Sequence, residues 1–197
     1  MIRRIAIVTP VLDDWDYFIA LTGEIAQRFK ADEIVFHLIA VDDGSNAPLD
    51  LAILPLPADG AIASVEILRL VVNLGHQRAI AVGLCAIAER KDIDAVIVMD
   101  CDGEDRPIDI ANLLAAGERY PSHVAVAHRT KRSETRIFRL LYASYKLLFH
   151  ILIGRTINFG NYSLIPMPAV QRLVHMPEMW NNLAAAILRS RLRYLPV

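Results

Sequence analysis

The sequence predicts an α/β fold in which helices flank a mostly parallel β-sheet. Four short segments rich in Ile, Val and other apolar residues are each bounded by polar residues, as buried strands are. Longer amphipathic segments separate them, and strands that alternate with helices in this way are typical of a Rossmann-like, doubly wound sheet. Such sheets bind their ligands at the carboxyl ends of the strands, so a site is expected in the residues that follow each strand.

The predicted elements follow one another along the whole chain. The expected strands cover 5–8, 34–41, 65–72 and 95–99, and the expected helices cover 14–29, 77–90 and 107–119. Pro107 suits the first turn of its helix, and Asp105 is placed to cap it. The segment 47–63 contains several prolines and is expected to be irregular. Later elements are predicted strands at 158–165 and 194–197 and helical segments at 169–174 and 181–191, within a single domain of residues 1–197 that is either short or truncated at its carboxyl end.

The composition is that of one domain that is free in solution or lies on a surface. Of the 197 residues, 54% are hydrophobic and 22% are charged, which supports a substantial core and argues against disorder. The net charge of −1 lacks the basic excess of nucleic-acid-binding proteins, so no nucleic-acid partner is expected. Cys85 and Cys101 are far apart, which predicts no disulfide and a reducing cytoplasm. No segment reaches the ~20 apolar residues needed to span a bilayer, so the expected location is cytoplasmic, either free or peripheral at the inner face of the membrane.

Polar clusters follow each of the first four predicted strands. Because the carboxyl ends of parallel strands meet at one edge of a sheet, we expect these clusters to form a single site. This convergence is the main functional signal in the sequence. The clusters are Pro10 to Asp14, Asp42-Asp43-Gly44-Ser45, Asn73-Leu74-Gly75 and Asp100-Cys101-Asp102.

The fourth cluster is strongly acidic, because Gly103, Glu104 and Asp105 extend it. In an extended strand end, Asp100 and Asp102 would point to the same side, with Glu104 within reach past the glycine. Carboxylates crowded in this way repel one another unless a cation or a proton lies among them, and hard oxygen ligands suit Mg²⁺ or Mn²⁺. A bound divalent ion is therefore favoured over the alternative, a solvated acidic loop that caps the next helix.

A strand followed by Asp-x-Asp-Gly also resembles the haloacid-dehalogenase-type phosphatases, in which the first Asp is a nucleophile. That interpretation would make Asp100 the nucleophile. It is the second choice, because those enzymes usually have Thr or Val where Glu104 stands. They also carry the motif on the first strand of the chain, whereas here three predicted strands precede it.

The second and third clusters suit a nucleotide. The carboxylates of Asp42 and Asp43 can accept hydrogen bonds from a base N–H or a ribose hydroxyl, although Asp-Gly-Ser is also ordinary turn sequence. Gly75 lets the backbone approach a ligand, and a helix N-terminus with Arg78 favours an anion; the alternative is a capped helix with exposed His76 and Arg78. Neither GxGxxG nor GxxxxGK followed by Ser or Thr occurs, so a dinucleotide oxidoreductase and a P-loop enzyme lose their main support.

Taken in order, these clusters resemble the family 2 glycosyltransferases of the GT-A fold. The resemblance rests on Thr9-Pro10-Val11 and on the three later clusters, and it spans nearly the whole chain. Within that family the sequence is most similar to the polyprenyl-phosphate glycosyltransferases, the dolichol-phosphate mannose synthase group. This closer similarity rests on residues 100–107, the basic run after Ala127, and Phe159-Gly160-Asn161-Tyr162-Ser163.

The resemblance implies a metal-dependent, inverting transfer of a sugar from a UDP- or GDP-sugar donor to a polyprenyl phosphate. Asp42 or Asp43 would hold the base and ribose, and Asp100 would contact the nucleotide. Asp102 and Glu104 would hold Mg²⁺ or Mn²⁺ against the diphosphate, with an extra negative charge because family members commonly have Gln where Glu104 stands. The basic positions implied to engage phosphates are Arg129, Arg132 and Arg136, and the remaining donor-binding candidates are Pro10, Asp13, Asn73, Gly75 and Arg78.

The sequence departs from the family pattern at two places. Many relatives have Tyr-Asn-Glu after the proline of the first strand, where this chain has Val11-Leu12-Asp13-Asp14. Asn161 stands where relatives often have Asp, so no protein general base is expected there. An acceptor phosphate is already ionised and needs none. The same departure keeps a non-catalytic nucleotide-sugar-binding protein as an alternative.

The segment 137–153 is a predicted helix with more apolar residues than one buried face requires. Together with the basic residues that precede it, this helix could lie in an anionic lipid interface. The alternative is packing in the core or between the copies of a homo-oligomer.

Overall fold

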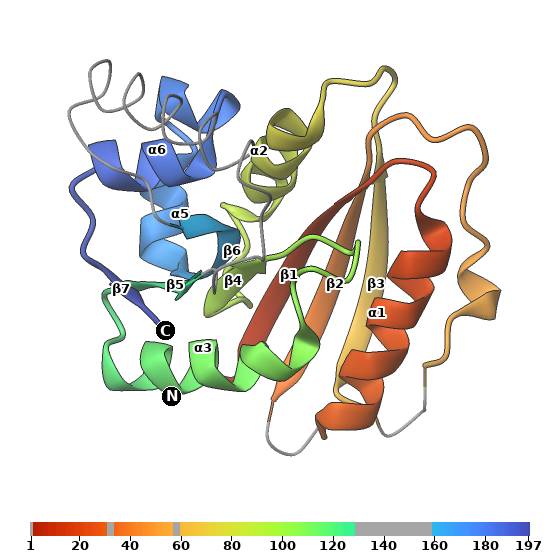
Figure 1. The fold of residues 1–197 in the computed structure, drawn as a ribbon, viewed down its shortest axis with the longest axis horizontal. Coiled ribbons are helices and arrows are strands. Elements are labelled where there is room, and N and C mark those ends of the chain that lie inside the picture. Colours follow the sequence, from red (N-terminus) through yellow and green to blue (C-terminus); the bar gives the residue numbers. More distant parts are fainter. Residues whose placement is uncertain (1, 31–33, 57–59, 129–158) are drawn as a thin grey trace, which may run out of the picture.

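A seven-stranded sheet forms the centre of the molecule, with the strand order β3-β2-β1-β4-β6-β5-β7 (Figure 1). The structure is a computed structural model that describes residues 2–30, 34–56, 60–128 and 159–197. All the strands of this sheet are parallel except β6, which is antiparallel to both of its neighbours. The strands are β1 (Arg4–Val11), β2 (Val35–Asp42), β3 (Ile62–Arg69), β4 (Ala95–Val98), β5 (Val124–His128), β6 (Phe159–Pro166) and β7 (Tyr194–Pro196).

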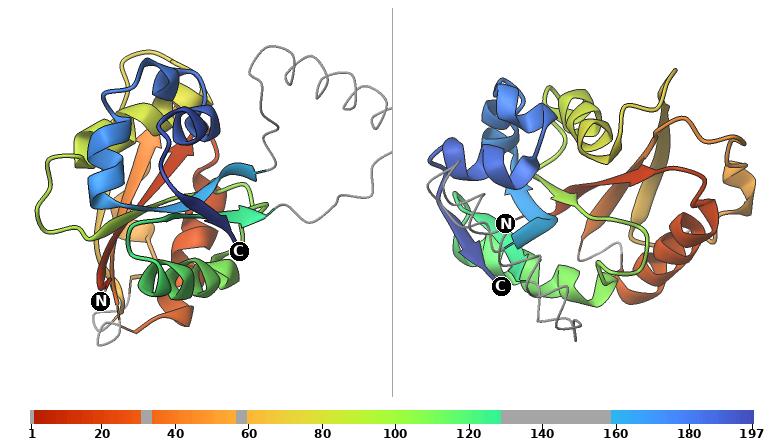
Figure 2. Two further views of the ribbon diagram at one scale, coloured as in Figure 1. Left: turned by 90° about the vertical axis from the view of Figure 1, so that its left-hand side faces the viewer. Right: turned by 45° about the horizontal axis from the view of Figure 1, so that its top comes forward.

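Helices cover both faces of the sheet, so the described part of the chain has three layers (Figures 1 and 2). One face is covered by α1 and α3, and the other by α2, α5 and α6. The helices are α1 (Trp15–Arg28), α2 (His76–Ile87), α3 (Ile110–Arg119), α5 (Met167–Leu173) and α6 (Leu183–Arg189), with short 3₁₀ turns η1 (Leu51–Ile53), η2 (Pro107–Asp109) and η3 (Pro177–Trp180).

The central strand β1 shows why this sequence builds two cores. Ile5 and Ile7 pack with α1 and α3, whereas Ala6 and Val8 pack with α2 on the opposite face. All four are fully buried. A strand covered on both faces is apolar at every position, which is why residues 5–8 form one continuous apolar run.

The antiparallel strand β6 brings a distant part of the chain to the carboxyl edge of the sheet. It pairs with β4 so that Val98 lies opposite Ser163 and Ala95 opposite Pro166. Because β6 runs against β4, its first residues lie beside the last residues of β4. Asn161 therefore reaches the edge where the four polar clusters were predicted to meet.

Gly83 allows α2 to pack directly against the sheet. A Cβ at this position would lie 2.5 Å from Val8 Cγ1 and 2.9 Å from Val41 Cγ2, closer than such atoms can approach. Both valines are fully buried and β-branched, so neither can rotate away freely. This contact fixes the position of α2, and hence of its N-terminus, relative to β1 and β2.

The predicted fold class is confirmed, and most predicted elements are present with ends shifted by a few residues. One of these is β3, which covers Ile62–Arg69 where 65–72 was predicted. Its last pair is Asp42 with Arg69, because β3 is an edge strand that stops where its neighbour β2 stops. Val71 and Val72 lie beyond that point and are exposed, so their apolar character did not signal burial.

Three further predictions about local structure were wrong or incomplete. The strand β5 was not predicted; both of its partners, β6 and β7, come much later in the sequence. β4 ends at Val98, so the alternation expected to align Asp100 with Asp102 does not extend to them. Asp105 does not cap the following helix, because its Oδ2 instead accepts a hydrogen bond from the backbone N–H of Asp100 at 2.9 Å.

Some of the predicted functional residues lie outside the described residues. These are Arg129, Arg132 and Arg136, together with the apolar segment 137–153. Within the ranges that are described, no helix is both long and apolar enough to cross a membrane.

We expect Gly83→Ala to destabilise the protein by about 1–2 kcal/mol. The added methyl group overpacks the contact with Val8 and Val41, which outweighs the gain of up to about 1 kcal/mol that Ala gives over Gly in a helix. Gly23→Ala in α1 is the matched control, since its Cβ would meet only Pro55 Cγ at 3.3 Å. Urea unfolding would measure both variants, and equal stability of the two would contradict the proposed packing.

Candidate functional site

The polar clusters that follow β1, β2, β3 and β4 are joined to one another by hydrogen bonds at one edge of the sheet. Hydrogen bonds link the first cluster to the second and the second to the third, and His76, the residue after the third cluster, contacts Asp100 of the fourth. Residues that were predicted to meet because of strand topology alone are therefore in direct contact. The start of β6 joins them through Asn161.

Asp13 connects the end of β1 to the turn after β2. Its backbone N–H donates to Ser45 Oγ at 2.9 Å, and its carboxylate accepts the backbone and side-chain N–H groups of Asn46, each at 2.8 Å. Asp13 has a φ of 57°, a left-handed conformation that Asp tolerates better than most residues. Pro10, the other candidate on this strand, accepts a weak hydrogen bond from Cys101 Sγ at 3.8 Å through its carbonyl.

Asp42 is fully buried and shapes the turn that follows β2. Its Oδ1 accepts the backbone N–H of Ser45 at 2.7 Å. Its Oδ2 lies 3.5 Å from Arg69 Nε and has no hydrogen-bond partner among the described residues. Arg69 also donates to the Ser45 carbonyl at 3.0 Å, so Asp42, Ser45 and Arg69 form one closed cluster.

Asp43 joins the turn after β2 to the loop between β3 and α2. Its two carboxylate oxygens accept the backbone N–H groups of Leu74 at 2.7 Å and of Gly75 at 3.0 Å. Asn73 Oδ1 lies 3.0 Å from the same Gly75 nitrogen. Gly44 is needed beside Asp43 because its φ is +91° and a Cβ there would lie 3.2 Å from the Asn73 nitrogen. Asp43 thus holds the entry to α2.

The first turn of α2 faces the site. Gly75 precedes the helix with a φ of +89°, and its carbonyl accepts the backbone N–H groups of Arg78 and Ala79. The Arg78 side chain is exposed. The predicted anion site therefore consists of a helix N-terminus with one exposed cation beside it.

The acidic turn, residues 100–105, is folded by its own carboxylates. Asp105 Oδ2 accepts the Asp100 backbone N–H, and Asp102 Oδ1 accepts the Glu104 backbone N–H, both at 2.9 Å. Gly103, with a φ of +85°, forms the bend between them. Asp102 and Glu104 are exposed, whereas Asp100 is half-buried.

The acidic turn fits a divalent ion only as a partial set of ligands. No group of three or more His, Cys, Asp or Glu side chains in the described part of the chain is arranged to hold a metal. Mg²⁺ is usually bound by one or two carboxylates, with water and substrate phosphates as its other ligands, and two exposed carboxylates in one turn match that chemistry. Burial raises the pKa of the Cys101 thiol to about 11, so this side chain does not supply a thiolate ligand at neutral pH.

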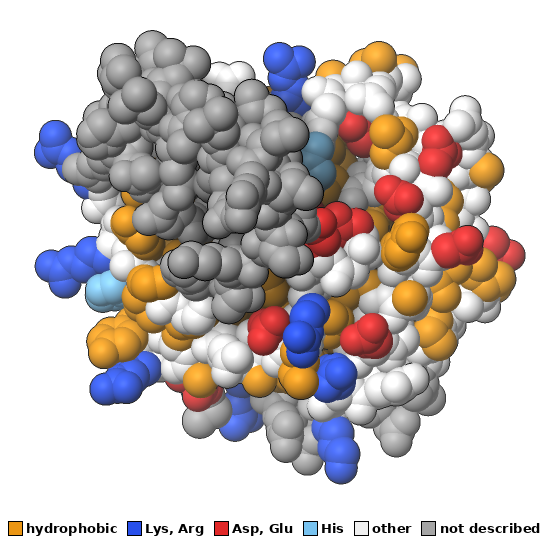
Figure 3. Space-filling model, in the orientation of Figure 1, with side chains coloured by type: hydrophobic (Ala, Val, Ile, Leu, Met, Phe, Trp, Pro, Cys, Tyr) orange, Lys and Arg blue, Asp and Glu red, His pale blue; other side chains and the backbone are white. Residues whose placement is uncertain are grey.

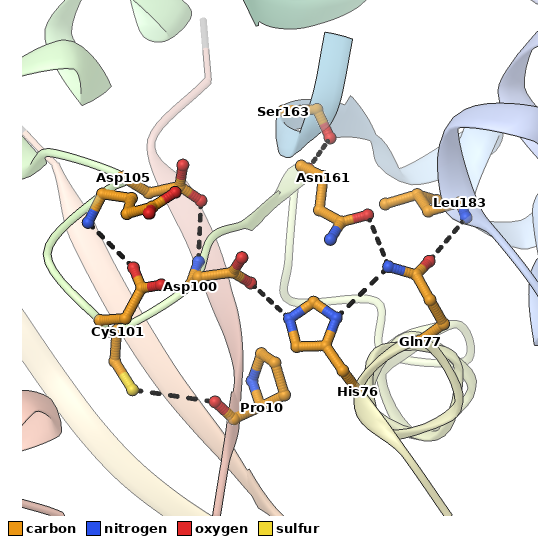
Figure 4. Close-up of polar contacts among 11 residues, drawn as sticks. Pro10, His76, Gln77, Asp100, Cys101, Asp105, Asn161, Ser163 and Leu183 are labelled. Carbon is orange, nitrogen blue, oxygen red and sulfur yellow. Dashed lines mark hydrogen bonds and ion pairs between the residues drawn. The ribbon is translucent and has the colours of Figure 1, made fainter. Parts of the chain in front are cut away.

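His76 and Asp100 form a hydrogen-bonded pair that the sequence did not reveal. His76 Nε2 lies 2.8 Å from Asp100 Oδ1 (Figure 4). This hydrogen bond raises the pKa of His76, partial burial opposes the rise, and the charges of Asp100, Asp102 and Asp105 add to it. Because α2 and the acidic turn are separate in sequence, only the fold brings the imidazole to the carboxylate.

Gln77 is a second contact residue that sequence reasoning missed. Its side chain reaches Asn161 on β6 and the backbone of Leu183 at the start of α6, as Figure 4 shows.

The surface view in Figure 3 shows a His side chain set into a hollow with Asp and Glu side chains beside it. A separate hollow, lined by Ile2, Asp94, Glu118 and three prolines, lies near the amino-terminal ends of β1 and β4 and contains none of the predicted residues.

Comparison with known proteins gives a family match and a fold match. The family described as glycosyl transferase family 2 matches residues 6–175. A crystal structure of S. aureus TarS is similar with a TM-score of 0.61 at 14% identity, covering 98% of this chain and 58% of that one. A crystal structure of a mycobacterial protein is similar with a TM-score of 0.57 at 18% identity, covering 84% of this chain and 54% of the other. The chain thus corresponds to little more than half of each structure, and no curated protein matches it.

The His76–Asp100 pair should make stability depend on pH. A pKa raised in the folded state gives a stabilisation that is fully present below the ordinary value of 6.5 and is lost as the pH rises through the folded-state pKa. We therefore expect His76→Asn to be more destabilising at pH 5.5 than at pH 9. The effect will be small, because the His76 side chain is 46% exposed and solvent screens the pair. Urea unfolding at both pH values would check this, and in an Asp100→Asn background the difference should shrink, because only the weaker effects of Asp102 and Asp105 remain.

Proposed function

The chain belongs to glycosyl transferase family 2, and on that basis we propose that it transfers a sugar from a nucleotide-sugar donor to a phosphate-bearing acceptor. The observation that carries the proposal is the meeting of four strand ends around the acidic turn, inside the region that the family matches. Because the chain covers little more than half of the similar structures, the activity of the whole protein is part of this proposal.

The donor would lie along the carboxyl edge of the sheet. The N-terminus of α2 and Arg78 offer partial and full positive charge to a diphosphate. The base and ribose would lie near the turn after β2, which Asp42 shapes through Ser45 and Arg69; Asp42 Oδ2 has no hydrogen bond among the described residues. Asp43 would act indirectly, since both of its oxygens already hold the loop that leads into α2.

A divalent ion would be held by Asp102 and Glu104, with Asp100 facing the nucleotide. The exposure of both side chains in one tight turn supports this assignment. When bound, such an ion offsets the negative charge that develops on a departing nucleoside diphosphate, which can lower a barrier by several kcal/mol.

We propose a direct displacement at the anomeric carbon, with inversion. The acceptor oxygen forms the new bond to that carbon as the bond to the diphosphate oxygen breaks, and the diphosphate takes the electron pair. Asn161 supports an acceptor that is already ionised, because an amide cannot remove a proton and its Oδ1 accepts a hydrogen bond from Gln77 Nε2 at 3.1 Å. A lipid phosphate such as a polyprenyl phosphate satisfies this requirement.

The polyprenyl-phosphate subgroup and contact with a membrane surface belong to the same proposal. Their support is the basic run with Arg129, Arg132 and Arg136 and the apolar segment 137–153, which all lie outside the described residues. A basic run beside a strongly apolar helix suits an anionic lipid surface.

We expect a nucleotide sugar with Mn²⁺ to raise the melting temperature of the protein and to be turned over. Asp102→Ala should remove the Mn²⁺-dependent part of the shift and lower kcat by about 100-fold or more. Glu89→Ala is the control and should behave as wild type, because Glu89 is an exposed carboxylate just beyond the carboxyl end of α2. A panel of UDP- and GDP-sugars would also identify the base.

Binding without turnover would indicate a non-catalytic binding protein, and hydrolysis of a phosphate ester without any nucleotide sugar would favour the phosphatase interpretation.

The nature of the acceptor can be tested with a matched pair of lipids. We expect a polyprenyl phosphate to accept the sugar and the corresponding polyprenol to be inactive, since Asn161 is an amide and cannot itself deprotonate an alcohol. Asn161→Asp should leave turnover with the phosphate within about threefold of wild type, because a carboxylate can still accept from Gln77. Product analysis with radiolabelled donor would measure both, and equal use of the alcohol by wild type would refute the ionised-acceptor model.

A further inference from the structure

Gln77 makes three contacts through one carboxamide, and they join three elements of the fold. Its Oε1 accepts the backbone N–H of Leu183 on α6 at 3.1 Å. Its Nε2 donates to Asn161 Oδ1 on β6 at 3.1 Å and lies 3.3 Å from His76 Nδ1 on α2. In Figure 4 the amide lies between the His76 ring, Asn161 and Leu183.

The orientation of this amide follows from its partners. A backbone N–H can only donate, so the Leu183 contact requires the oxygen of Gln77 on that side. The amide nitrogen then faces Asn161 and His76 and can only donate to them. It follows that Nδ1 of His76 is an acceptor and that, in the neutral ring, the proton is on Nε2.

That tautomer is the one that can hold Asp100. With its proton on Nε2, the His76 ring donates to Asp100 Oδ1 at 2.8 Å. The backbone N–H of Asp100 is held separately by Asp105 at 2.9 Å. The position of the Asp100 carboxylate therefore depends on a directed chain of donors that runs from Leu183 through Gln77 and His76.

We propose that Gln77 is a positioning residue for the acidic turn: it orients the His76 ring in the Nε2–H tautomer, and His76 in turn fixes the Asp100 carboxylate for the donor nucleotide. The expected effect of Gln77 on turnover rests on the proposed function, whereas the tautomer of His76 is independent of it. Asp100 is the residue through which Gln77 would act.

A second glutamine shows what a purely structural contact would look like. Gln171 on α5 donates to the Ala88 carbonyl at the end of α2, also at 3.1 Å. It joins two helices as Gln77 does, but its contact with Ala88 lies at the opposite end of α2 from the site. Gln171→Leu is therefore a matched control for the loss of one amide bond between helices.

Two substitutions separate positioning from simple attachment of α6. Gln77→Glu keeps an oxygen to accept from Leu183 but cannot donate to Asn161 or His76. Gln77→Leu loses all three contacts. If Gln77 only attached α6 to α2, Gln77→Glu would retain wild-type turnover; if it positions His76, both variants lose turnover.

The first measurement is the state of the His76 ring by ¹⁵N NMR of histidine-labelled protein at a pH where the wild-type ring is neutral. We expect a protonated Nε2 and an unprotonated Nδ1 in wild type and in Gln171→Leu. In Gln77→Glu the carboxylate faces Nδ1, so that nitrogen should become protonated. Wild-type ¹⁵N shifts in Gln77→Glu, or the opposite tautomer in wild type, would overturn the proposal even if the protein proved to have another activity.

The second measurement is steady-state kinetics with the donor found in the nucleotide-sugar panel. We expect both Gln77 variants to lower kcat by about tenfold with the donor KM changed by less than about threefold, and Gln171→Leu to stay within about twofold of wild type. Unchanged kcat in Gln77→Glu would overturn the proposal. Failure of wild type to use any nucleotide sugar would instead refute the proposed function, and the NMR result would still decide the role of Gln77.

Discussion

The arrangement of the site depends on buried and half-buried carboxylates that accept backbone N–H groups from neighbouring loops. Asp43 holds the loop before α2 in this way, Asp42 holds its own turn, and Asp105 holds the start of the acidic turn. Hydrogen bonds to an ionised acceptor are about twice as strong as neutral ones. Each of these hydrogen bonds therefore fixes the relative position of two segments that the sheet alone only brings near one another. Several carboxylates at this edge therefore bind backbone N–H groups of the protein itself. Asp102 and Glu104, by contrast, are exposed to solvent.

The antiparallel strand β6 joins the site from the opposite direction. The strands β1 to β4 supply side chains to the carboxyl edge from their last residues and from the loops that follow them. β6 enters that edge from the opposite direction and supplies Asn161 from its first residues. Through Gln77, this strand and α6 are connected to the residues that follow β3 and β4, so the second half of the chain shares in the geometry of the first.

The fold class and the meeting of the polar clusters at one edge of the sheet could be predicted from sequence because both follow from local patterns. Apolar runs of strand length alternate with amphipathic helices, and polar clusters after the strands must share an edge. Asp105 was expected to cap a helix, but its carboxylate instead accepts the backbone N–H of Asp100 within its own turn. The roles of His76 and Gln77 could not be predicted, because each depends on a partner in another element. The strand β5 was missed for the same reason, and the end of β3 was misplaced because exposed Val71 and Val72 look like core residues in the sequence.

The close contact at Gly83 also determines which parts of the edge can vary independently. α2 rests on Val8 and Val41 with no room for a side chain between them, so its N-terminal turn moves with the sheet as one rigid unit. In the acidic turn, by contrast, Cys101 is buried in the core whereas Asp102, Gly103 and Glu104 are exposed. A substitution at the exposed residues 102–104 that alters ligand preference would therefore leave the glycine beneath α2, and the scaffold that it fixes, unchanged.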